Sequence, residues 1–207
     1  MPNNMTCLTA GPAGRNLKSV CFTGPRPVHL HGYADQAPYM PVVEIMAAVI
    51  TGLADAGVTD FVTGGAQGLD QLAFWAVDRV KRSRPAIRNV MYVPFDAQAS
   101  RWSRFGLFSQ AEYMRCRQQA DEVRVLAPDP PADRPYAAAK LMHARNHAMV
   151  DDTDVTVALL ADRSLDYAHS KGGTSECVRY ALSQKKPVLA VEYRPGTDAP
   201  FTVRWID

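Results

Sequence analysis

The sequence lacks most features that mark secreted, metal-binding, membrane or nucleic-acid-binding proteins. Its four cysteines form neither a CxxC pair nor a paired Cys/His spacing, so no disulfide framework and no structural zinc are predicted. It has no long uncharged apolar run, so no transmembrane helix is expected. The 23 Lys and Arg residues nearly balance 21 Asp and Glu residues, and the net charge of +2 disfavours a nucleic-acid or membrane partner.

What remains is the composition of one globular domain. A chain of 207 residues suits a single α/β domain, and 47% hydrophobic with 21% charged residues is ordinary for a folded protein. Residues 1–16 contain no continuous apolar stretch and are predicted to be a disordered leader rather than a signal peptide. Residues 17–207 then form the domain, and the scattered cysteines favour the reducing cytoplasm.

Apolar patterns alternate between those of strands and those of amphipathic helices. Strands are predicted at 18–24, 60–63, 89–95, 122–126, 155–160 and 187–193, with a short edge strand at 201–206. Helices are predicted between them at 38–56, 69–80, 109–119, 136–150 and 173–183. This alternation predicts an α/β fold with a Rossmann-like, doubly wound and mainly parallel sheet. The strand residues expected in the core are Val20, Phe22, Phe61, Val62, Val157, Leu159, Leu189 and Val191.

Three glycine-containing loops follow predicted strands and precede or open helices. They cover residues 23–26 (TGPR), 63–68 (TGGAQG) and 171–175 (KGGTS). In a parallel sheet the carboxyl ends of the strands share one edge, where ligands bind. Glycine lets backbone amides approach a phosphate, and a helix N-terminus adds partial positive charge. One such loop by itself is read as a turn, whereas three on one edge predict an anion-binding pocket.

Several common sites are absent from the sequence. No Walker A motif occurs, and no GxGxxG opens a helix after the first strand, so P-loop and ordinary NAD-dehydrogenase sites are disfavoured. His143 and His147 have a spacing that can bind zinc, but the sequence offers no evident third ligand, so no metal and no cofactor are predicted.

Two further segments have both a structural and a functional interpretation. Arg145 lies on one helical face at the end of a predicted helix, with Asn146 beside it, and it is either a solvated arginine or a ligand contact. Phe95 follows a strand and could stack on a ring of the ligand or belong to the core.

Five motifs in the same order resemble the YpsA-like branch of the SLOG superfamily. That superfamily also includes the Lonely guy phosphoribohydrolases and the DNA-processing protein DprA. The motifs are FTGPRP at 22–27, FVTGGAQGLD at 61–70, VPF at 93–95, RNHAMVD at 145–151 and KGGTSECVRYA at 171–181.

The resemblance implies a nucleotide site at the glycine loops and candidate catalytic residues in Arg145 and Glu176. In the Lonely guy pattern a lysine follows the arginine, where this chain has Asn146, and Glu176 lies one position nearer the threonine. One residue turns a helical side chain by about 100°. The residues predicted to contact the ligand are Gly24, Pro25, Arg26, Gly64, Gly65, Ala66, Gly68, Asp70, Phe95, Arg145, Asn146, Gly172, Gly173, Thr174 and Ser175.

Three functions are compatible with these residues. The first is a sensor or carrier of a phosphorylated nucleotide derivative, such as ADP-ribose or a nucleotide sugar, without turnover. The second is a nucleoside-monophosphate N-glycosidase, in which Glu176 or Asp70 is the acid or base and Arg145 holds phosphate. The third is a DprA-like binder of single-stranded DNA, which the small net charge disfavours. The resemblance also implies a homodimer, and the apolar and aromatic content of residues 102–113 predicts that this segment supplies part of its interface.

Overall fold

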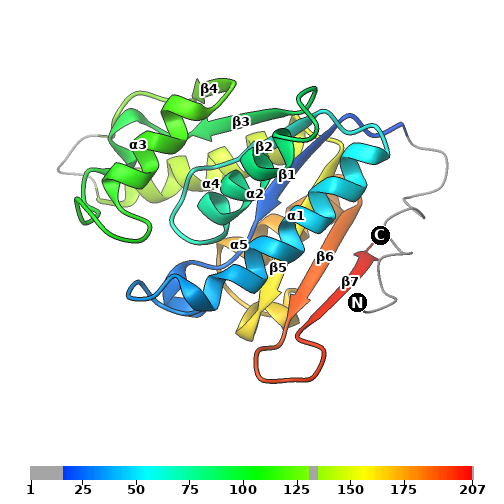
Figure 1. The fold of residues 1–207 in the computed structure, drawn as a ribbon. Helices are drawn as coiled ribbons and strands as arrows, with labels where there is room; N and C mark the ends of the chain where they lie inside the picture. Colours follow the sequence, from blue (N-terminus) through cyan, green and yellow to red (C-terminus); the bar gives the residue numbers. More distant parts are fainter. Residues whose placement is uncertain (1–15, 131–134, 207) are drawn as a thin grey trace.

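The computed structural model describes residues 16–130 and 135–206. The predicted leader, residues 1–16, therefore lies outside the described residues except for its last position. A seven-stranded sheet with the order β4-β3-β2-β1-β5-β6-β7 forms the centre of the molecule (Figure 1). Strands β1 to β6 are parallel, and β7 is antiparallel to β6. The strands are β1 (Ser19–Thr23), β2 (Asp60–Thr63), β3 (Arg88–Val93), β4 (Glu122–Val125), β5 (Val155–Ala161), β6 (Val188–Tyr193) and β7 (Phe201–Ile206).

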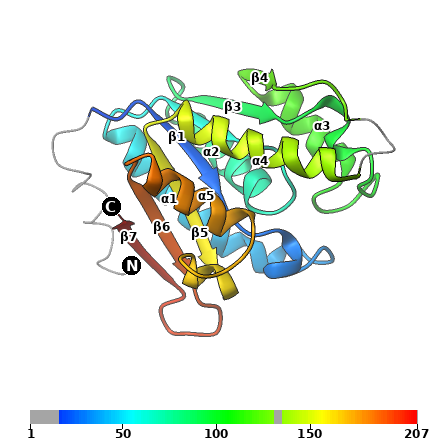
Figure 2. The same cartoon turned by 180° about the vertical axis from the view of Figure 1, so that it is seen from behind.

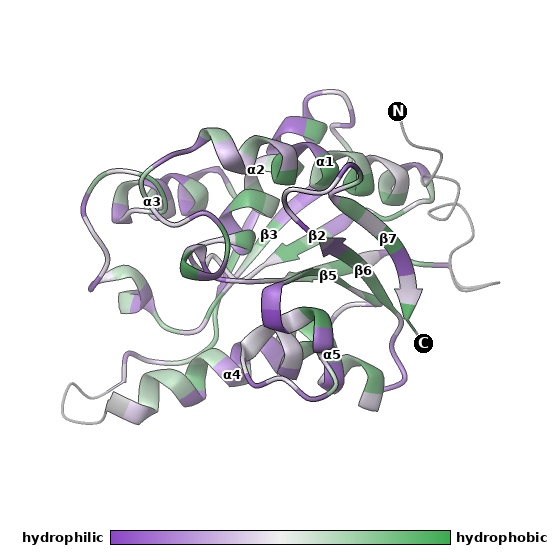
Figure 3. Cartoon of the chain, turned by 90° about the horizontal axis from the view of Figure 1, so that it is seen from below, coloured by the Kyte–Doolittle hydropathy of each residue, from purple (hydrophilic) through white to green (hydrophobic). Residues whose placement is uncertain are grey.

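Helices cover both faces of this sheet. Helices α1 and α2 lie on one face, with α3 beside α2, whereas α4 and α5 lie on the other (Figures 1 and 2). Figure 3 shows the sheet between these two layers. The helices are α1 (Met40–Asp55), α2 (Leu69–Lys81), α3 (Gln110–Gln119), α4 (Pro135–Asp151) and α5 (Gly173–Ser183).

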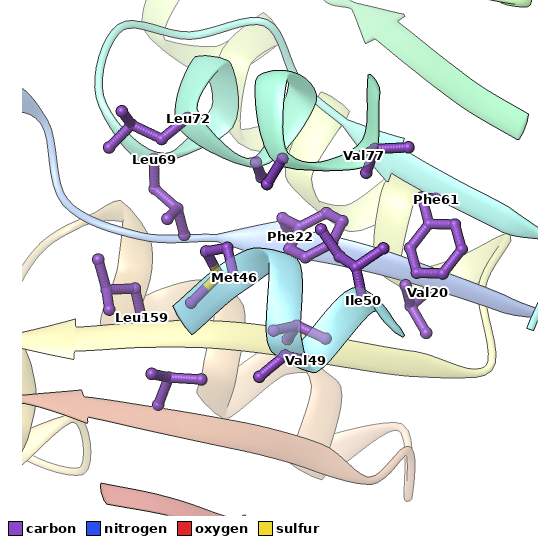
Figure 4. Packing of buried hydrophobic residues seen from close by; sticks show 14 of the residues in the cluster. Val20, Phe22, Met46, Val49, Ile50, Phe61, Leu69, Leu72, Val77 and Leu159 are labelled. Carbon is purple, nitrogen blue, oxygen red and sulfur yellow. The ribbon is translucent and has the colours of Figure 1, made fainter. Parts of the chain in front are cut away.

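Alternation along the central strands divides the core in two. Val20 and Phe22 of β1 pack in the cluster under α1 and α2, whereas Cys21 between them packs with α4 and α5. Figure 4 shows Met46 and Ile50 of α1 in the first cluster, close to the β1 side chains. All eight strand residues predicted for the core are buried. The predicted Rossmann-like, mainly parallel sheet is therefore confirmed, including the edge strand at the C-terminal end.

The structure adds short 3₁₀ turns that the sequence patterns did not predict. Ala37–Tyr39 forms one turn, so α1 begins at Met40 rather than at 38, and others lie at Pro27–His29 and Asp162–Asp166 in loops after β1 and β5. Among the described residues, the stretch Ala37–Asp55 is long and apolar enough to cross a membrane by length and composition. Its apolar side chains, however, pack against the sheet and α2, as in a core helix of a soluble α/β fold.

The strand order fixes where a ligand pocket can form. The chain proceeds from β1 outward to β4 on one side and, after α4, from β5 outward to β7 on the other. The loops that follow β1 and β5 therefore leave the sheet in opposite directions, and a crevice opens between them at this topological switch point.

Candidate functional site

A pocket of about 450 Å³ lies at the carboxyl ends of β1 and β5. This volume falls within the range of small-molecule sites. Its walls come from the loop after β1, the start of α2, the face of α4, the loop after β5 and the N-terminus of α5. Segments that are far apart in the sequence thus meet at the switch point.

A buried ion pair forms part of the pocket wall. Arg145 of α4 is 4% exposed, and its Nη1 donates a hydrogen bond to Asp70 Oδ2 at 3.0 Å. The same oxygen accepts the backbone N–H of Ala66 at 3.1 Å, which ties the loop after β2 to the first turn of α2. Because Asp70 matches the charge of Arg145, this arginine is not a free counter-charge for an anion.

Residue 64 must be glycine because the Arg145 side chain occupies the space that a side chain at position 64 would need. A Cβ at Gly64 would lie 1.0 Å from Arg145 Nη1 and 2.7 Å from Asp70 Oδ2. No side chain therefore fits at this position while the pair is intact. Gly64 itself is buried and does not line the pocket.

Gly68 permits the loop after β1 to pass close to α2. Its φ is +92°, and a Cβ there would lie 2.4 Å from the carbonyl oxygen of Pro25. The N–H of Leu69 donates to the same carbonyl at 3.3 Å. This close approach holds Pro25 and Arg26 at the pocket, where both line the wall.

The N-terminus of α5 forms the opposite wall. Gly172, Gly173, Thr174 and Ser175 all line the pocket. The first intrahelical bond joins Glu176 N–H to the Gly172 carbonyl, so the amides before Glu176 have no partner within the helix. At Gly173 an added Cβ would meet only Asn146 Nδ2, at 3.8 Å, so the space above this amide is open. Such a helix end favours an anion.

Three positively charged side chains line the pocket without a carboxylate partner among the described residues: Arg26, Arg163 and Lys171. Burial lowers the pKa of the Arg26 guanidinium, and its hydrogen bond goes to Met142 Sδ at 3.9 Å, a weak acceptor. Arg163 Nη2 lies 2.7 Å from His29 Nε2, which also lines the pocket. The wall as a whole therefore carries an excess of positive charge.

Glu176 turns away from the pocket toward α4. His143 Nδ1 lies 2.9 Å from Glu176 Oε2, and His147 Nε2 lies 2.7 Å from Oε1. Burial raises the pKa of Glu176, but the hydrogen bonds from the two histidines outweigh it and hold the pKa below its ordinary value. His147 is in turn stacked on Tyr180, with ring centroids 3.8 Å apart, and Tyr180 donates to Asp151.

The predicted site residues separate into two sets by position. Those that line the pocket are Gly24, Pro25, Arg26, Ala66, Asp70, Arg145, Asn146, Gly172, Gly173, Thr174 and Ser175. Those outside its lining are Gly64, Gly65, Gly68, Phe95 and Glu176. Phe95 is 5% exposed at the end of the β3 segment, and Met91 and Tyr113 surround Gly65, so both positions belong to the interior.

Sequence reasoning missed several polar side chains of the pocket. His29 and Arg163 lie in the unpredicted 3₁₀ turns after β1 and β5, and no periodic pattern identifies such turns. His143 could have been found, because its spacing from His147 places both on one face of α4. The sequence did not show that the tertiary structure places Glu176 against that face of α4.

Within residues 16–130 and 135–206, no group of three or more His, Cys, Asp and Glu side chains is arranged to hold a metal ion. The predicted interface segment, 102–113, is only partly exposed. Phe108 and Tyr113 are buried, whereas Phe105 is 79% exposed.

Comparison with known proteins shows the family of this chain. The model of the YspA SLOG family (YpsA) matches residues 20–194, which run from β1 to the end of β6. The Bacillus subtilis protein named "Uncharacterized SPbeta prophage-derived protein YoqJ" is 33% identical over 129 residues, covering 58% of this chain and 68% of the relative.

A second relative covers more of this chain. The UPF0398 protein SERP1017 of Staphylococcus epidermidis is 26% identical over 147 residues, which cover 70% of this chain and 74% of that protein. The family match includes all five motifs and every strand that borders the pocket. The chain therefore belongs to the YpsA (YspA) SLOG family.

Proposed function

We propose that this protein binds a phosphorylated nucleotide derivative of the ADP-ribose or nucleotide-sugar type, as a cytoplasmic sensor or carrier. The proposal rests on one observation: the open N-terminus of α5 lines the same pocket as Arg26, Arg163 and Lys171. Membership of a SLOG family supports a nucleotide-related ligand. The three described cysteines are unpaired and buried, which is compatible with a reducing compartment.

The charge distribution favours a phosphate over a neutral ligand. Four positively charged residues line the pocket, and the one carboxylate among its lining residues, Asp70, is already paired with Arg145. An anion bound there would gain attraction from the three remaining cations and from the amides at Gly173 and Thr174. Ala139, Met142 and Ala161 supply an apolar wall for the rest of the ligand.

Binding without turnover follows from the orientation of Glu176. Both of its carboxylate oxygens accept hydrogen bonds from histidines of α4, and it is not part of the pocket lining. A general acid or base must reach the reacting atoms within hydrogen-bond distance. The features that favour an anion thus line the pocket, while both candidate catalytic carboxylates are engaged with other side chains, Glu176 with the two histidines and Asp70 with Arg145.

The test is the thermal unfolding of the protein with ADP-ribose and with AMP. Ligand at about 100 times Kd stabilises the folded state by about 2.7 kcal/mol, which for a chain of this size raises Tm by about 5–10 °C. Gly173→Asp is expected to weaken binding at least tenfold, roughly the effect of one adjacent like charge. Gly173→Asn has nearly the same shape without the charge, and it should retain most of the affinity.

Because an added Cβ at Gly173 meets no neighbour closer than 3.8 Å, both variants should fold. Affinity equal to that of the wild type in both variants would show that no phosphate sits at the α5 N-terminus. A short single-stranded oligonucleotide serves as the comparison ligand. Stabilisation by the oligonucleotide but by neither nucleotide would replace the proposal with DNA binding.

A further inference from the structure

His143 lines the pocket, but the proposed function gives it no role. Its side chain is 53% exposed and lines the pocket, while its Nδ1 lies 2.9 Å from Glu176 Oε2. An ionised carboxylate can only accept hydrogen bonds, so His143 Nδ1 carries the proton and donates it. The ring nitrogen left for a ligand is Nε2.

Glu176 is held rigidly enough to orient this ring. Its second oxygen accepts from His147 Nε2 at 2.7 Å, and the His147 ring is stacked on Tyr180 with an interplanar angle of 10°. Tyr180 Oη donates to Asp151 Oδ1 at 3.0 Å, which links α5 to the end of α4. Glu176 is therefore fixed from the side opposite His143.

The two protonation states of His143 differ in what they offer to an anion. With Nδ1–H committed to Glu176, the neutral ring presents a bare Nε2 lone pair, which repels a phosphate oxygen. The protonated ring presents Nε2–H and a positive charge, while Glu176 beside it stabilises that charge.

We propose that His143 is a proton-dependent contact for the anionic group of the bound nucleotide, oriented by Glu176. This inference rests on the proposed function and adds a regulated feature to it: affinity for a diphosphate-containing ligand falls as His143 loses its proton. Glu176 acts as a positioning residue, because it touches the imidazole and not the ligand.

Other ionisable groups surround the same pocket and must be distinguished from His143. The charged and titratable residues that line it are Arg26, His29, Asp70, Arg145, Arg163 and Lys171, and His147 lies on the far side of Glu176. The other histidine among the lining residues is His29, so it is the residue that a control must address.

The experiment is calorimetric titration with ADP-ribose between about pH 6 and about pH 8, where its diphosphate does not change charge. The wild type is expected to lose about three- to tenfold in affinity over this range, less than a buried charged hydrogen bond contributes, because the His143 side chain is about half exposed. We call the change of affinity with pH over this range the slope. His143→Gln should bind with the weaker, high-pH affinity of the wild type at both pH values and should therefore show no slope.

His169→Gln is the matched control. His169 also bonds to a carboxylate, Asp166, at 2.9 Å, but it does not line the pocket, so this variant should keep the wild-type slope. Glu176→Gln should reduce the slope while leaving the high-pH affinity nearly unchanged. In imidazole ¹⁵N spectra without ligand, His143 should be protonated at Nδ1 when neutral, and Glu176→Gln should change that signal.

The outcomes separate this inference from the proposed function. Failure of the wild type to bind any nucleotide at either pH would contradict the proposed function itself. Binding with an unaltered slope in His143→Gln, or a slope that disappears only in His29→Gln, would overturn the role of His143 alone. A neutral His143 protonated at Nε2 would overturn the orientation by Glu176.

Discussion

At the scale of single residues, the Arg145–Asp70 pair connects stability to the shape of the pocket. Both side chains are almost completely buried, at 5% and 11% exposure, and they join α4 to the start of α2. Removing one member leaves a buried charge without compensation, which is the costly way to break such a pair. Replacing Arg145 is therefore expected to lower the stability of the fold first and to affect ligand binding as a consequence.

We predict that Arg145→Met lowers the free energy of unfolding by about 3–5 kcal/mol, because Asp70 remains as a buried, unpaired carboxylate. The double variant Asp70→Asn/Arg145→Met should recover a large part of this loss, since neither charge remains. Urea denaturation of the wild type, both single variants and the double variant measures the coupling. A loss of less than about 1 kcal/mol in Arg145→Met would show that the pair is solvated.

At the scale of secondary-structure elements, Asp154 joins the beginnings of the two strands that form the switch point. It precedes β5, and its Oδ2 accepts the backbone N–H groups of Lys18 and Ser19 at 2.7 and 2.9 Å and the Ser19 hydroxyl at 3.1 Å. The strands themselves pair from Val20 with Val155 onward. This carboxylate therefore fixes the register of β1 and β5 at the edge opposite the pocket.

Asp154 should also make the fold sensitive to acid. Burial raises its pKa, but the hydrogen bonds from Lys18 and Ser19 outweigh this and hold the pKa below the ordinary value. A carboxyl whose pKa is lower in the folded state contributes stability above its unfolded pKa of about 4. That contribution is lost as the pH falls through the lower, folded value.

The corresponding prediction compares the wild type with Asp154→Asn by urea denaturation over a pH series. At neutral pH the variant should be less stable by about 1–2 kcal/mol, because charged hydrogen bonds are lost at a partly exposed site. The difference should begin to shrink below about pH 4, where the carboxyl of the unfolded chain binds a proton, and should be lost once the pH falls below the lower, folded pKa. A difference that stays constant down to about pH 2 would contradict the assignment.

At the scale of the whole molecule, the question is whether the pocket turns its ligand over. Incubation with AMP, NAD and ADP-ribose, followed by chromatography, is expected to release no base beyond the uncatalysed background. The reason is the engagement of Glu176 with His143 and His147, since even a displacement of about 1 Å of a catalytic group can cost 10²-fold in rate. Release that scales with protein concentration and is abolished in Glu176→Gln would assign an N-glycosidase instead.

The sequence alone was sufficient to predict the architecture of this protein. Strand and helix periodicities are local properties, and continuous apolar strands such as β5 can only be buried on both faces, so a parallel sheet with two helical layers followed. The glycine loops after β1 and before α5 could also be predicted, because their glycines stand where a predicted strand ends or a predicted helix begins. The family resemblance, carried by ordered motifs, was confirmed by the match over residues 20–194.

Only the tertiary structure decided which of these residues share the pocket and what each one does there. Gly64 and Arg145 lie far apart in the sequence, yet the position of the Arg145 guanidinium explains why residue 64 is a glycine. Glu176 could equally have faced the pocket or α4, and His143 and His147 on the neighbouring helix determine which. Such choices depend on side-chain contacts between elements, and hydrophobic periodicity along the chain contains no information about them.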